Sequence, residues 1–364
     1  MSEARKKEKV NFRKLNLALI FGGRSAEHEV SIQSAKNIMA AIDKKKYKLI
    51  LIGISRSGKW FLQKSIGIEV DESNQEVVFL HGRQGDLVAL SGSKVKLHAD
   101  VAFPILHGSN GEGGAVQGIL QSADIPFVGA GVLGSAVGMD KDVMKRLLKE
   151  ANLPVAKFVV FRKFQKNEIV FNKIKKEIGL PFFVKPANSG SSIGISMVKN
   201  EEEFYSAVSL AFSFDRKIIF EESIKGKEIE CSVLGNDNPI VSACGEITSK
   251  YEFYSYKAKY VDKNGAIFDI PARIDKRTEK KIKELSVKAF KALECEGMAR
   301  VDFFLTEKGE IYINEINTIP GFTKISMYPK LWEISGVSYS NLIDKIINFS
   351  IERFEQEKKT KKKL

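Results

Sequence analysis

Residues Ala299–Gly321 read ARVDFFLTEKGEIYINEINTIPG, and this stretch predicts a β-hairpin. Its two arms, Val301–Leu305 and Ile311–Ile316, are rich in the β-branched and aromatic residues that favour strands. Lys308-Gly309, between the arms, supplies the turn. The sequence therefore predicts two neighbouring antiparallel strands here.

One face of this hairpin carries an unusual set of polar side chains. A hairpin that is symmetric about the turn dipeptide places Asp302 opposite Glu315 and Arg300 opposite Asn317, all on one face. Buried strands seldom carry such groups without a ligand. Oxygen ligands suit Mg²⁺, which proteins hold through one or two carboxylates together with substrate phosphates. The pattern predicts a Mg²⁺ and phosphate site, and the alternative is an exposed face with ordinary cross-strand ion pairs.

Length and composition indicate a globular protein of several domains. The chain has 364 residues, of which 43% are hydrophobic and 28% are charged, so we expect two or three domains. No apolar run approaches the roughly 20 residues of a membrane helix, and the first residues lack the apolar core of a secretion signal. The three cysteines argue against a disulfide framework or a zinc cluster. We expect a cytoplasmic protein with no membrane partner.

The formal charge of +13 raises the alternative of a nucleic-acid-binding protein. Residues 1–14 carry six Lys/Arg and two Glu, which gives +4, and residues 358–364 carry five Lys, which gives +5. The remainder therefore carries only +4 (13 − 4 − 5). The positive charge is concentrated in the two terminal segments, and the net charge between them is small. This distribution favours solvated ends over a nucleic-acid-binding surface.

The first part of the chain has the pattern of a parallel α/β sheet. Leu15–Gly23, Tyr47–Ser55 and Asp100–Gly108 read as buried strands, and Ser31–Ile42 has helical periodicity. Glycine turns follow the strands, at the edge where such sheets bind ligands. No intact G-x-G-x-x-G follows the first strand, so a dinucleotide site has little support.

A second unit begins at Gly138–Phe161, where Asp140 is a plausible N-cap of a helix. Further on, Lys185 ends a strand and a loop of small residues follows it, which allows backbone N–H groups to approach phosphate closely. This loop is not a P-loop, and taken alone it is more often a simple turn. The chain ends with an amphipathic helix at Tyr339–Phe354, and Tyr251–Asp269 is the best candidate for a mobile lid.

Other polar residues have two interpretations each. Glu221, Glu222 and Glu228 follow a strand and would receive hydroxyl or amino groups, or form a solvated acidic connection. Glu27 stands at a helix start, where a carboxylate serves as a cap or binds a substrate ammonium. His107 ends a buried strand, where a histidine with one hydrogen bond is the commoner finding.

Together these segments resemble the D-alanine–D-alanine ligases of the ATP-grasp superfamily, from about Leu15 to Phe349. The matching segments occur in the family's order: GGRSAEHEVS, LHGSNGEGGAVQGIL, GMDK, VKPANSGSSIG, EFYSYKAKY, GMARVDFF and NEINTIPGFT. The resemblance implies an N-terminal parallel α/β domain followed by an ATP-grasp fold, in which two sheets enclose ATP. The implied boundaries are a basic tail at 1–14, an N-terminal domain at 15–136, a central domain at 137–222, a C-terminal domain at 223–354 and a basic tail at 355–364.

The resemblance also implies roles for individual residues. Lys141 and Lys185 would hold the α- and β-phosphates of ATP, Glu228 the ribose and Lys259 the γ-phosphate. The remaining ATP contacts would come from Ser191, Ser192, Glu221, Glu222, Ile224 and Asn317. Two Mg²⁺ (or Mn²⁺) ions would bind to Asp302, Glu315 and Asn317.

The implied reaction joins two D-alanines through an acyl phosphate, for peptidoglycan precursor synthesis. The resemblance also implies that the protein is a homodimer. Arg300 and the Gly321 N–H would stabilise the tetrahedral intermediate. Glu27 would bind the first D-alanine in a network with Ser191 and Tyr260, close to His107. The second D-alanine would contact Ser326 and Met327.

Two departures from the family pattern concern the substrate pockets rather than the reaction class. Asn188-Ser189 stands where charged residues are common, and Lys324 is unusual after Gly321. The retained Tyr260 favours the dipeptide over a D-alanyl-D-lactate product. Other ATP-grasp ligases, D-lactate or D-serine variants, and a non-catalytic nucleotide-binding regulator are the alternatives.

Overall fold

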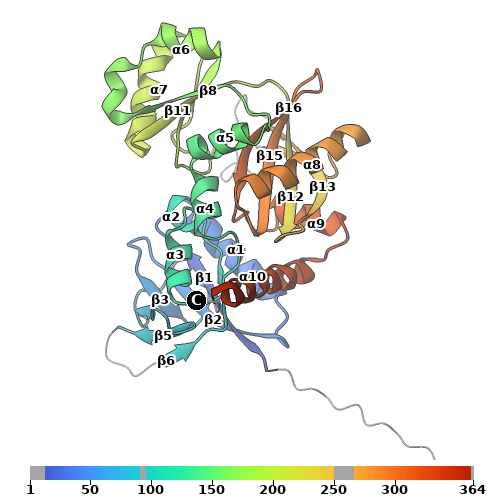
Figure 1. Ribbon diagram of the computed structural model, residues 1–364. Helices are drawn as coiled ribbons and strands as arrows, with labels where there is room; N and C mark the ends of the chain where they lie inside the picture. Colours follow the sequence, from blue (N-terminus) through green and yellow to red (C-terminus); the bar gives the residue numbers. More distant parts are fainter. Residues whose placement is uncertain (1–12, 91–95, 250–265, 362–364) are drawn as a thin grey trace, which may run out of the picture.

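The computed structural model describes residues 13–90, 96–249 and 266–361, and in these ranges the chain forms four sheets (Figure 1). Lys259, Tyr260 and most of the segment predicted as a lid lie outside the described residues. Three larger sheets follow one another along the chain, and we name them the N-terminal, central and C-terminal sheets. In Figure 1 the central sheet with α6 and α7 lies at one end, and α4 and α5 run between it and the N-terminal sheet.

The N-terminal sheet has the strand order β3-β2-β1-β7. The predicted parallel pairing is confirmed, because β1 pairs in parallel with both β2 and β7, while β3 is antiparallel to β2. The strands and the first helix are β1 (Leu15–Gly22), β2 (Tyr47–Ile54), β3 (Trp60–Gln63), β7 (Val101–Pro104) and α1 (His28–Ala41). The helix starts earlier than the predicted Ser31, and β7 ends before Gly108.

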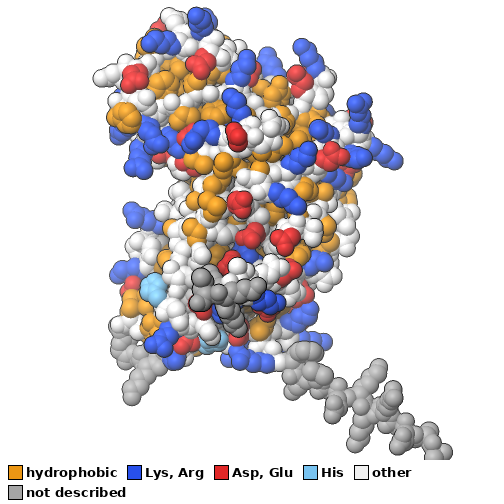
Figure 2. Space-filling model, viewed as in Figure 1, with side chains coloured by type: hydrophobic (Ala, Val, Ile, Leu, Met, Phe, Trp, Pro, Cys, Tyr) orange, Lys and Arg blue, Asp and Glu red, His pale blue; other side chains and the backbone are white. Residues whose placement is uncertain are grey.

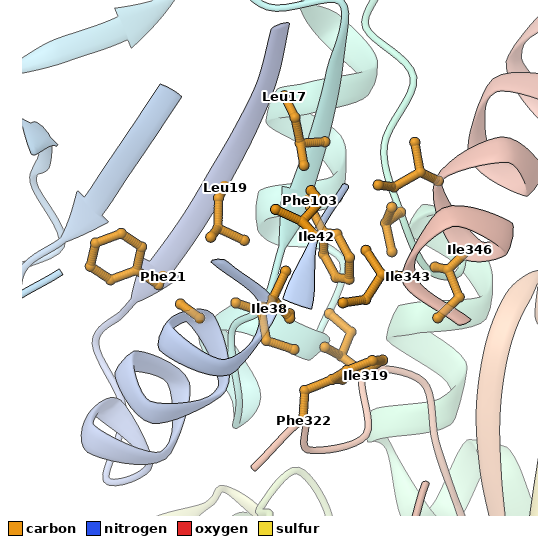
Figure 3. Packing of buried hydrophobic residues seen from close by; sticks show 14 of the residues in the cluster. Leu17, Leu19, Phe21, Ile38, Ile42, Phe103, Ile319, Phe322, Ile343 and Ile346 are labelled. Carbon is orange, nitrogen blue, oxygen red and sulfur yellow. The ribbon is translucent and has the colours of Figure 1, made fainter. Parts of the chain in front are cut away.

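A core on one face of this sheet joins it to the end of the chain. Leu19 and Phe103 of the sheet pack with Ile319 and Phe322, which follow the hairpin, and with Ile343 of the last helix (Figure 3). All of these side chains are fully buried. The packing fixes the segment after the hairpin against the N-terminal sheet, although the two are far apart in sequence.

Smaller elements cover the other face and lead to the central sheet. A three-stranded antiparallel sheet contains β4 (Val77–Phe79), β5 (Asp86–Ala89) and β6 (Lys96–His98). The helices that follow are α2 (Ser109–Glu112), α3 (Ala115–Ser122), α4 (Val132–Met139) and α5 (Lys141–Glu150). The predicted N-cap of α5 is confirmed, because the carboxylate of Asp140 accepts hydrogen bonds from the N–H groups of Asp142 and Val143.

The central sheet is antiparallel, in the order β10-β9-β11-β8. Its elements are β8 (Phe158–Arg162), a 3₁₀ helix (Lys163–Glu168), α6 (Phe171–Ile178), β9 (Phe182–Pro186), β10 (Ser196–Val198), α7 (Glu201–Phe214) and β11 (Lys217–Glu222). Phe182, Phe204 and Phe220 pack edge to face or stacked in the core between this sheet and its helices. Asn200 caps α7, and three glutamates in the first turn suit the positive end of the helix dipole.

The C-terminal sheet is also antiparallel, in the order β14-β13-β12-β15-β16. Its elements are β12 (Lys227–Gly235), β13 (Ile240–Ser249), β14 (Ala266–Asp269), α8 (Lys276–Ala292), β15 (Gly297–Leu305), β16 (Ile311–Asn317) and α9 (Met327–Ile334). Apolar residues of α8 and alternate residues of β12 and β15 form one core. The opposite face of β15 is therefore left for Arg300 and Asp302.

The last helix, α10 (Tyr339–Lys361), extends beyond the predicted end at Phe354. Part of the segment predicted as a basic tail is thus helical. In this added part, the Lys358 ammonium lies 4.3 Å from the centre of the Phe354 ring and 3.3 Å from Asp124.

The visible surface mixes both signs of charge. In Figure 2, Lys and Arg side chains are scattered over this face, with Asp and Glu between them, rather than gathered in one stripe. Among the described helices, none combines the length and apolar character that a membrane crossing needs.

Candidate functional site

The hairpin has the predicted cross-strand pairs but not the predicted symmetry. Arg300 lies opposite Asn317 and Asp302 opposite Glu315, as expected. Nearer the turn the register differs by one residue, since Phe303 pairs with Ile313. Two irregularities offset each other, a longer turn and a β-bulge.

The turn closes between Thr306 and Glu310, where the Thr306 N–H donates to the Glu310 carbonyl at 2.9 Å. Gly309 supplies a positive φ of 80° in this turn, which a three-residue loop requires. Asn314 is the extra residue of the bulge, between Ile313 and Glu315. The bulge restores the register in which the two carboxylates face each other.

Arg300 is the centre of a cluster of carboxylates on this face. Its Nε donates to Asp302 Oδ1 at 2.8 Å and its Nη2 to Asp302 Oδ2 at 2.7 Å. Glu230 of β12 lies 3.0 Å from Nε. Burial disfavours the charged guanidinium, but the two carboxylates outweigh burial and raise the pKa of Arg300 above its ordinary value. Arg300 is therefore a fixed positive charge beside the predicted metal ligands.

Lys141, the first residue of α5, connects this face to the glycine-serine loop. Its ammonium donates to the Ser189 carbonyl at 2.8 Å and lies 3.4 Å from Glu315 Oε2. A lysine predicted to bind phosphate is thus held between the loop and the hairpin.

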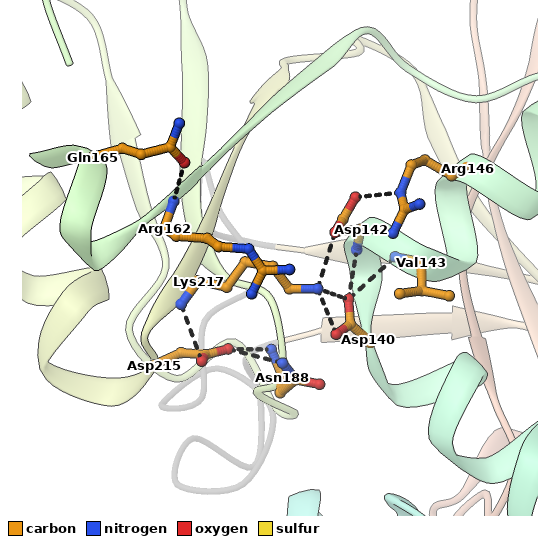
Figure 4. A network of polar contacts seen from close by, with 9 residues as sticks. All are labelled: Asp140, Asp142, Val143, Arg146, Arg162, Gln165, Asn188, Asp215 and Lys217. Atoms are coloured by element: carbon orange, nitrogen blue, oxygen red, sulfur yellow. Dashed lines mark hydrogen bonds and ion pairs between the residues drawn. The ribbon is translucent and has the colours of Figure 1, made fainter. Parts of the chain in front are cut away.

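A polar network fixes the start of α5 and of the loop (Figure 4). The Lys217 ammonium, which is buried, contacts Asp140 at 2.6 Å and Asp142 at 2.9 Å. Asp215 accepts from the Asn188 N–H at 2.8 Å and from the Asn188 side chain at 3.0 Å. Lys217 begins β11 and Asp215 lies between α7 and β11, so the central domain elements position the helix and the loop together.

A second buried ion cluster lies behind the loop. Glu221 of β11 contacts Lys185 at 2.6 Å through Oε1 and Lys145 at 2.9 Å through Oε2. Burial raises the pKa of Glu221, but Lys145 and Lys185 outweigh burial and lower it to about 2. Lys185 was predicted to bind phosphate, whereas Lys145 was not identified from the sequence.

The loop reaches the N-terminal sheet through Glu27. The Ser191 hydroxyl donates to Glu27 Oε1, and both Ser191 and Ser192 have positive φ. A Cβ on Gly190 would lie 3.0 Å from Glu27 Oε2, which is tighter than most side-chain contacts. The backbone of the loop therefore approaches the Glu27 carboxylate closely.

His107 supports the segment after the hairpin. Its Nδ1 lies 3.1 Å from the Ile319 carbonyl and its Nε2 lies 3.2 Å from the Ser34 hydroxyl. Ser34 also accepts from the Phe322 N–H at 3.2 Å. Burial lowers the pKa of His107, which favours the neutral ring. In this structure His107 and Ser34 place the residues on both sides of Gly321.

Ser326 lies at the start of α9, opposite Gly321. Its hydroxyl accepts from the Thr323 N–H at 3.0 Å. A Cβ on Gly321 would lie 2.7 Å from Ser326 Oγ, so only glycine fits there without a shift. The Gly321 backbone and the Ser326 hydroxyl are therefore neighbours.

These side chains surround a cavity of about 740 Å³. Ten predicted site residues line it: Glu27, His107, Lys141, Ser191, Arg300, Glu315, Asn317, Gly321, Ser326 and Met327. Seven others do not: Lys185, Ser192, Glu221, Glu222, Ile224, Glu228 and Asp302. Asp302 is nevertheless one contact away, because it pairs with Arg300, which lines the cavity. Lys185 pairs with Glu221, which does not line it.

Three residues that sequence reasoning missed belong to the site. Glu230 pairs with Arg300 and lines the cavity. Glu112 also lines it and accepts from the Gly108 N–H at 2.7 Å, while burial and the nearby Glu27 raise its pKa well above the ordinary value. The glycine-rich run around Glu112 was a signal for it, whereas nothing local marks Lys145.

The hairpin face fits a divalent ion that also binds phosphate. Among the described residues, no group of three or more His, Cys, Asp or Glu is arranged to hold a metal ion. Asp302 and Glu315 face each other beside the Asn317 amide, which gives two carboxylates and one neutral oxygen. This donor set is typical of Mg²⁺ that takes further ligands from phosphate and water.

Comparisons with known proteins agree along most of the chain. Residues 16–130 match the family described as D-ala D-ala ligase N-terminus, and residues 147–348 match D-ala D-ala ligase C-terminus. A D-alanine–D-alanine ligase from Oceanobacillus iheyensis is 51% identical over 359 residues, covering 96% of this chain and 98% of the relative.

Solved structures agree with these matches. The D-alanine-D-alanine ligase from Coxiella burnetii superposes with a TM-score of 0.85 at 36% identity, covering 96% of this chain and 97% of that one. The VanG D-Ala:D-Ser ligase from Enterococcus faecalis gives 0.83 at 40% identity, covering 93% of this chain and 100% of that one. The chain therefore belongs to the D-alanine–D-alanine ligase family and has its ATP-grasp fold.

Proposed function

We propose that the protein uses ATP to join two D-alanines into D-alanyl-D-alanine for peptidoglycan precursor synthesis. The observation that carries this proposal is the cavity. Its lining includes Glu27 of the N-terminal part, Ser191 of the loop, and Arg300 and Glu315 of the hairpin. In a member of this family, the Glu27 carboxylate would bind the ammonium of a substrate, and the cations would bind the phosphates of ATP.

ATP would lie between the central and C-terminal sheets. Lys141 and Lys185 would bind the α- and β-phosphates, with the Ser191 and Ser192 loop over them, and Lys259 would reach the γ-phosphate. The nucleoside end would contact the segment that joins β11 to β12. Its members are Glu221, Glu222, Ile224 and Glu228. The Glu221 carboxylate is enclosed by two lysines, so we assign its contact with the nucleotide to the backbone.

Asp302, Glu315 and Asn317 would hold two Mg²⁺ (or Mn²⁺) ions. Such ions neutralise phosphoryl oxygens and align them with the attacking group. The donors on the hairpin are held in place before any ligand arrives, since Arg300 fixes Asp302 and Lys141 lies against Glu315.

In the first step, a carboxylate oxygen of the first D-alanine attacks the γ-phosphorus of ATP, and ADP leaves. The Glu27 carboxylate binds the ammonium of this D-alanine, with Ser191 and Tyr260 in the same network. His107 keeps the adjacent wall in place. Lys141, which contacts the Ser189 carbonyl and Glu315, would offset the negative charge that accumulates on the phosphates.

In the second step, the amine of the second D-alanine attacks the acyl carbon, the amine loses a proton and inorganic phosphate leaves. The oxygen of the tetrahedral intermediate becomes negative. Arg300 and the Gly321 N–H would stabilise it as donors fixed in position before the reaction. Ser326 binds the carboxylate of the second D-alanine, and Met327, which is buried, packs beside it.

The second substrate is the finer part of the proposal. The structural similarity to the D-Ala:D-Ser ligase makes D-serine the principal rival acceptor, and D-lactate is the other. Tyr260 in KAKY favours an amine acceptor over D-lactate.

A competition assay tests the substrate. The protein is supplied with ATP, Mg²⁺ and equal D-alanine, D-serine and D-lactate, ADP release is followed, and products are identified by mass. We expect D-alanyl-D-alanine to predominate and L-alanine alone to give no ADP above background. Predominant D-alanyl-D-serine or depsipeptide would overturn the assigned acceptor, and the absence of D-alanine-dependent ADP release would overturn the reaction.

Three further assignments accompany this function. We propose the domain boundaries 15–136, 137–222 and 223–354, which keep each of the larger sheets within one domain. We also propose that the protein is a homodimer. We place it in the cytoplasm, the compartment in which ATP and the precursor pool are available.

A further inference from the structure

Lys145 is a fully buried lysine, within the part of the chain that the structure describes, that the proposed function does not use. Its side chain is 1% exposed, and its Nζ lies 2.9 Å from Glu221 Oε2. The same ammonium donates to the Asn314 carbonyl at 3.3 Å. A buried lysine without partners would cost free energy, so the contacts with Glu221 and Asn314 compensate the buried charge of Lys145.

Its position links the two sheets between which ATP would lie. Lys145 follows Lys141 by one helical turn on the same face of α5. Glu221 belongs to the central sheet, and Asn314 is the bulge residue directly before Glu315 of the C-terminal sheet. The Lys145 ammonium therefore contacts both Glu221, the partner of Lys185, and the bulge that orients a predicted metal ligand.

The charges around Glu221 are unequal. One buried carboxylate faces two lysines, Lys145 and Lys185, and all three side chains are less than 10% exposed. A single counter-ion would satisfy Glu221. The second lysine is available for another anion, provided that the first one stays.

We propose that Lys145 is a positioning residue that remains on Glu221 as its permanent counter-ion, so that Lys185 can exchange Glu221 for a phosphate of the nucleotide. Without Lys145, the departure of Lys185 would leave a buried carboxylate uncompensated, so Glu221 would hold Lys185 back. This inference rests on the proposed function, because that function identifies the incoming anion as ATP.

Two variants separate this role from simple support of the fold. Lys145→Met leaves Glu221 with Lys185 alone, and we expect the Kd for ATP to rise about tenfold, as a coupled charge pair allows. Lys145→Met with Glu221→Gln removes both members of the pair and releases Lys185. We expect the double variant to bind ATP within about threefold of wild type.

Equilibrium binding of ATP without D-alanine measures these values, so ligase turnover is not required. Lys149→Met is the matched control, because Lys149 is exposed one turn further along α5, and its Kd should equal that of wild type. Thermal melting of each variant shows that it is folded. A double variant that binds ATP as weakly as Lys145→Met, or more weakly, would overturn the proposal, as would a Lys145→Met variant with wild-type affinity.

If Lys145→Met is insoluble, the double variant decides alone. A folded double variant within about threefold of wild type supports the exchange, and any larger loss of affinity contradicts it. Failure of the proposed function is recognised separately, since wild-type protein would then show no D-alanine-dependent ADP release.

Discussion

Replacing Arg300 with alanine is expected to lower kcat by roughly two to three orders of magnitude, the loss seen when a donor to a developing oxyanion is removed. The guanidinium is fixed by Asp302 and Glu230 at 2.7–3.0 Å, so it costs little to reorganise during the reaction. KM for ATP should change much less than kcat, since the interaction is made mainly in the transition state. Steady-state ADP release with D-alanine measures both constants.

The control for this change is Arg273→Ala. Arg273 also pairs with an aspartate, Asp269, at 3.0 Å, but its side chain is 78% exposed and it lies outside the cavity. Its kcat should equal that of wild type. Melting curves are needed for Arg300→Ala, because Asp302 and Glu230 lose their shared cation. A folded Arg300→Ala variant with nearly wild-type kcat would remove Arg300 from the catalytic groups.

Glu315→Gln is expected to raise the Mg²⁺ concentration for half-maximal activity about tenfold and to lower kcat as well. The change keeps the size of the side chain but removes the charge that faces Asp302. It also removes the ionic partner of Lys141, which lies 3.4 Å away. A Mg²⁺ titration of ADP release at saturating ATP and D-alanine gives both quantities.

Glu310→Gln is the matched control, because Glu310 stands just before the same strand and is exposed. It should titrate with Mg²⁺ as wild type does. An unchanged titration for Glu315→Gln would exclude Glu315 as a metal ligand.

The face of the hairpin was predictable because strand periodicity depends only on local sequence. The pairs Asp302–Glu315 and Arg300–Asn317 were correct, although the assumed symmetry was wrong. The longer turn shifts the register in one direction and the Asn314 bulge shifts it back. The Asn314 carbonyl at this bulge accepts a hydrogen bond from Lys145, a residue far away in the sequence, and no local pattern predicts the bulge.

Residues whose importance depends on a distant partner could not be found in the sequence. Lys145 looks like any lysine of an amphipathic helix until the fold places it against Glu221. Glu230 is likewise one of several acids on its segment, and only strand pairing brings it to Arg300. In the extended part of α10, Lys358 pairs with Asp124, which belongs to the N-terminal part and is far away in the sequence.

A crystal structure with Mn²⁺ and a non-hydrolysable ATP analogue, with the metal located by its anomalous scattering, tests the central claim most directly. We predict manganese held by Asp302, Glu315 and Asn317 and by the phosphates of the analogue. Manganese bound elsewhere, or an analogue bound while both carboxylates contact only protein groups, would contradict it.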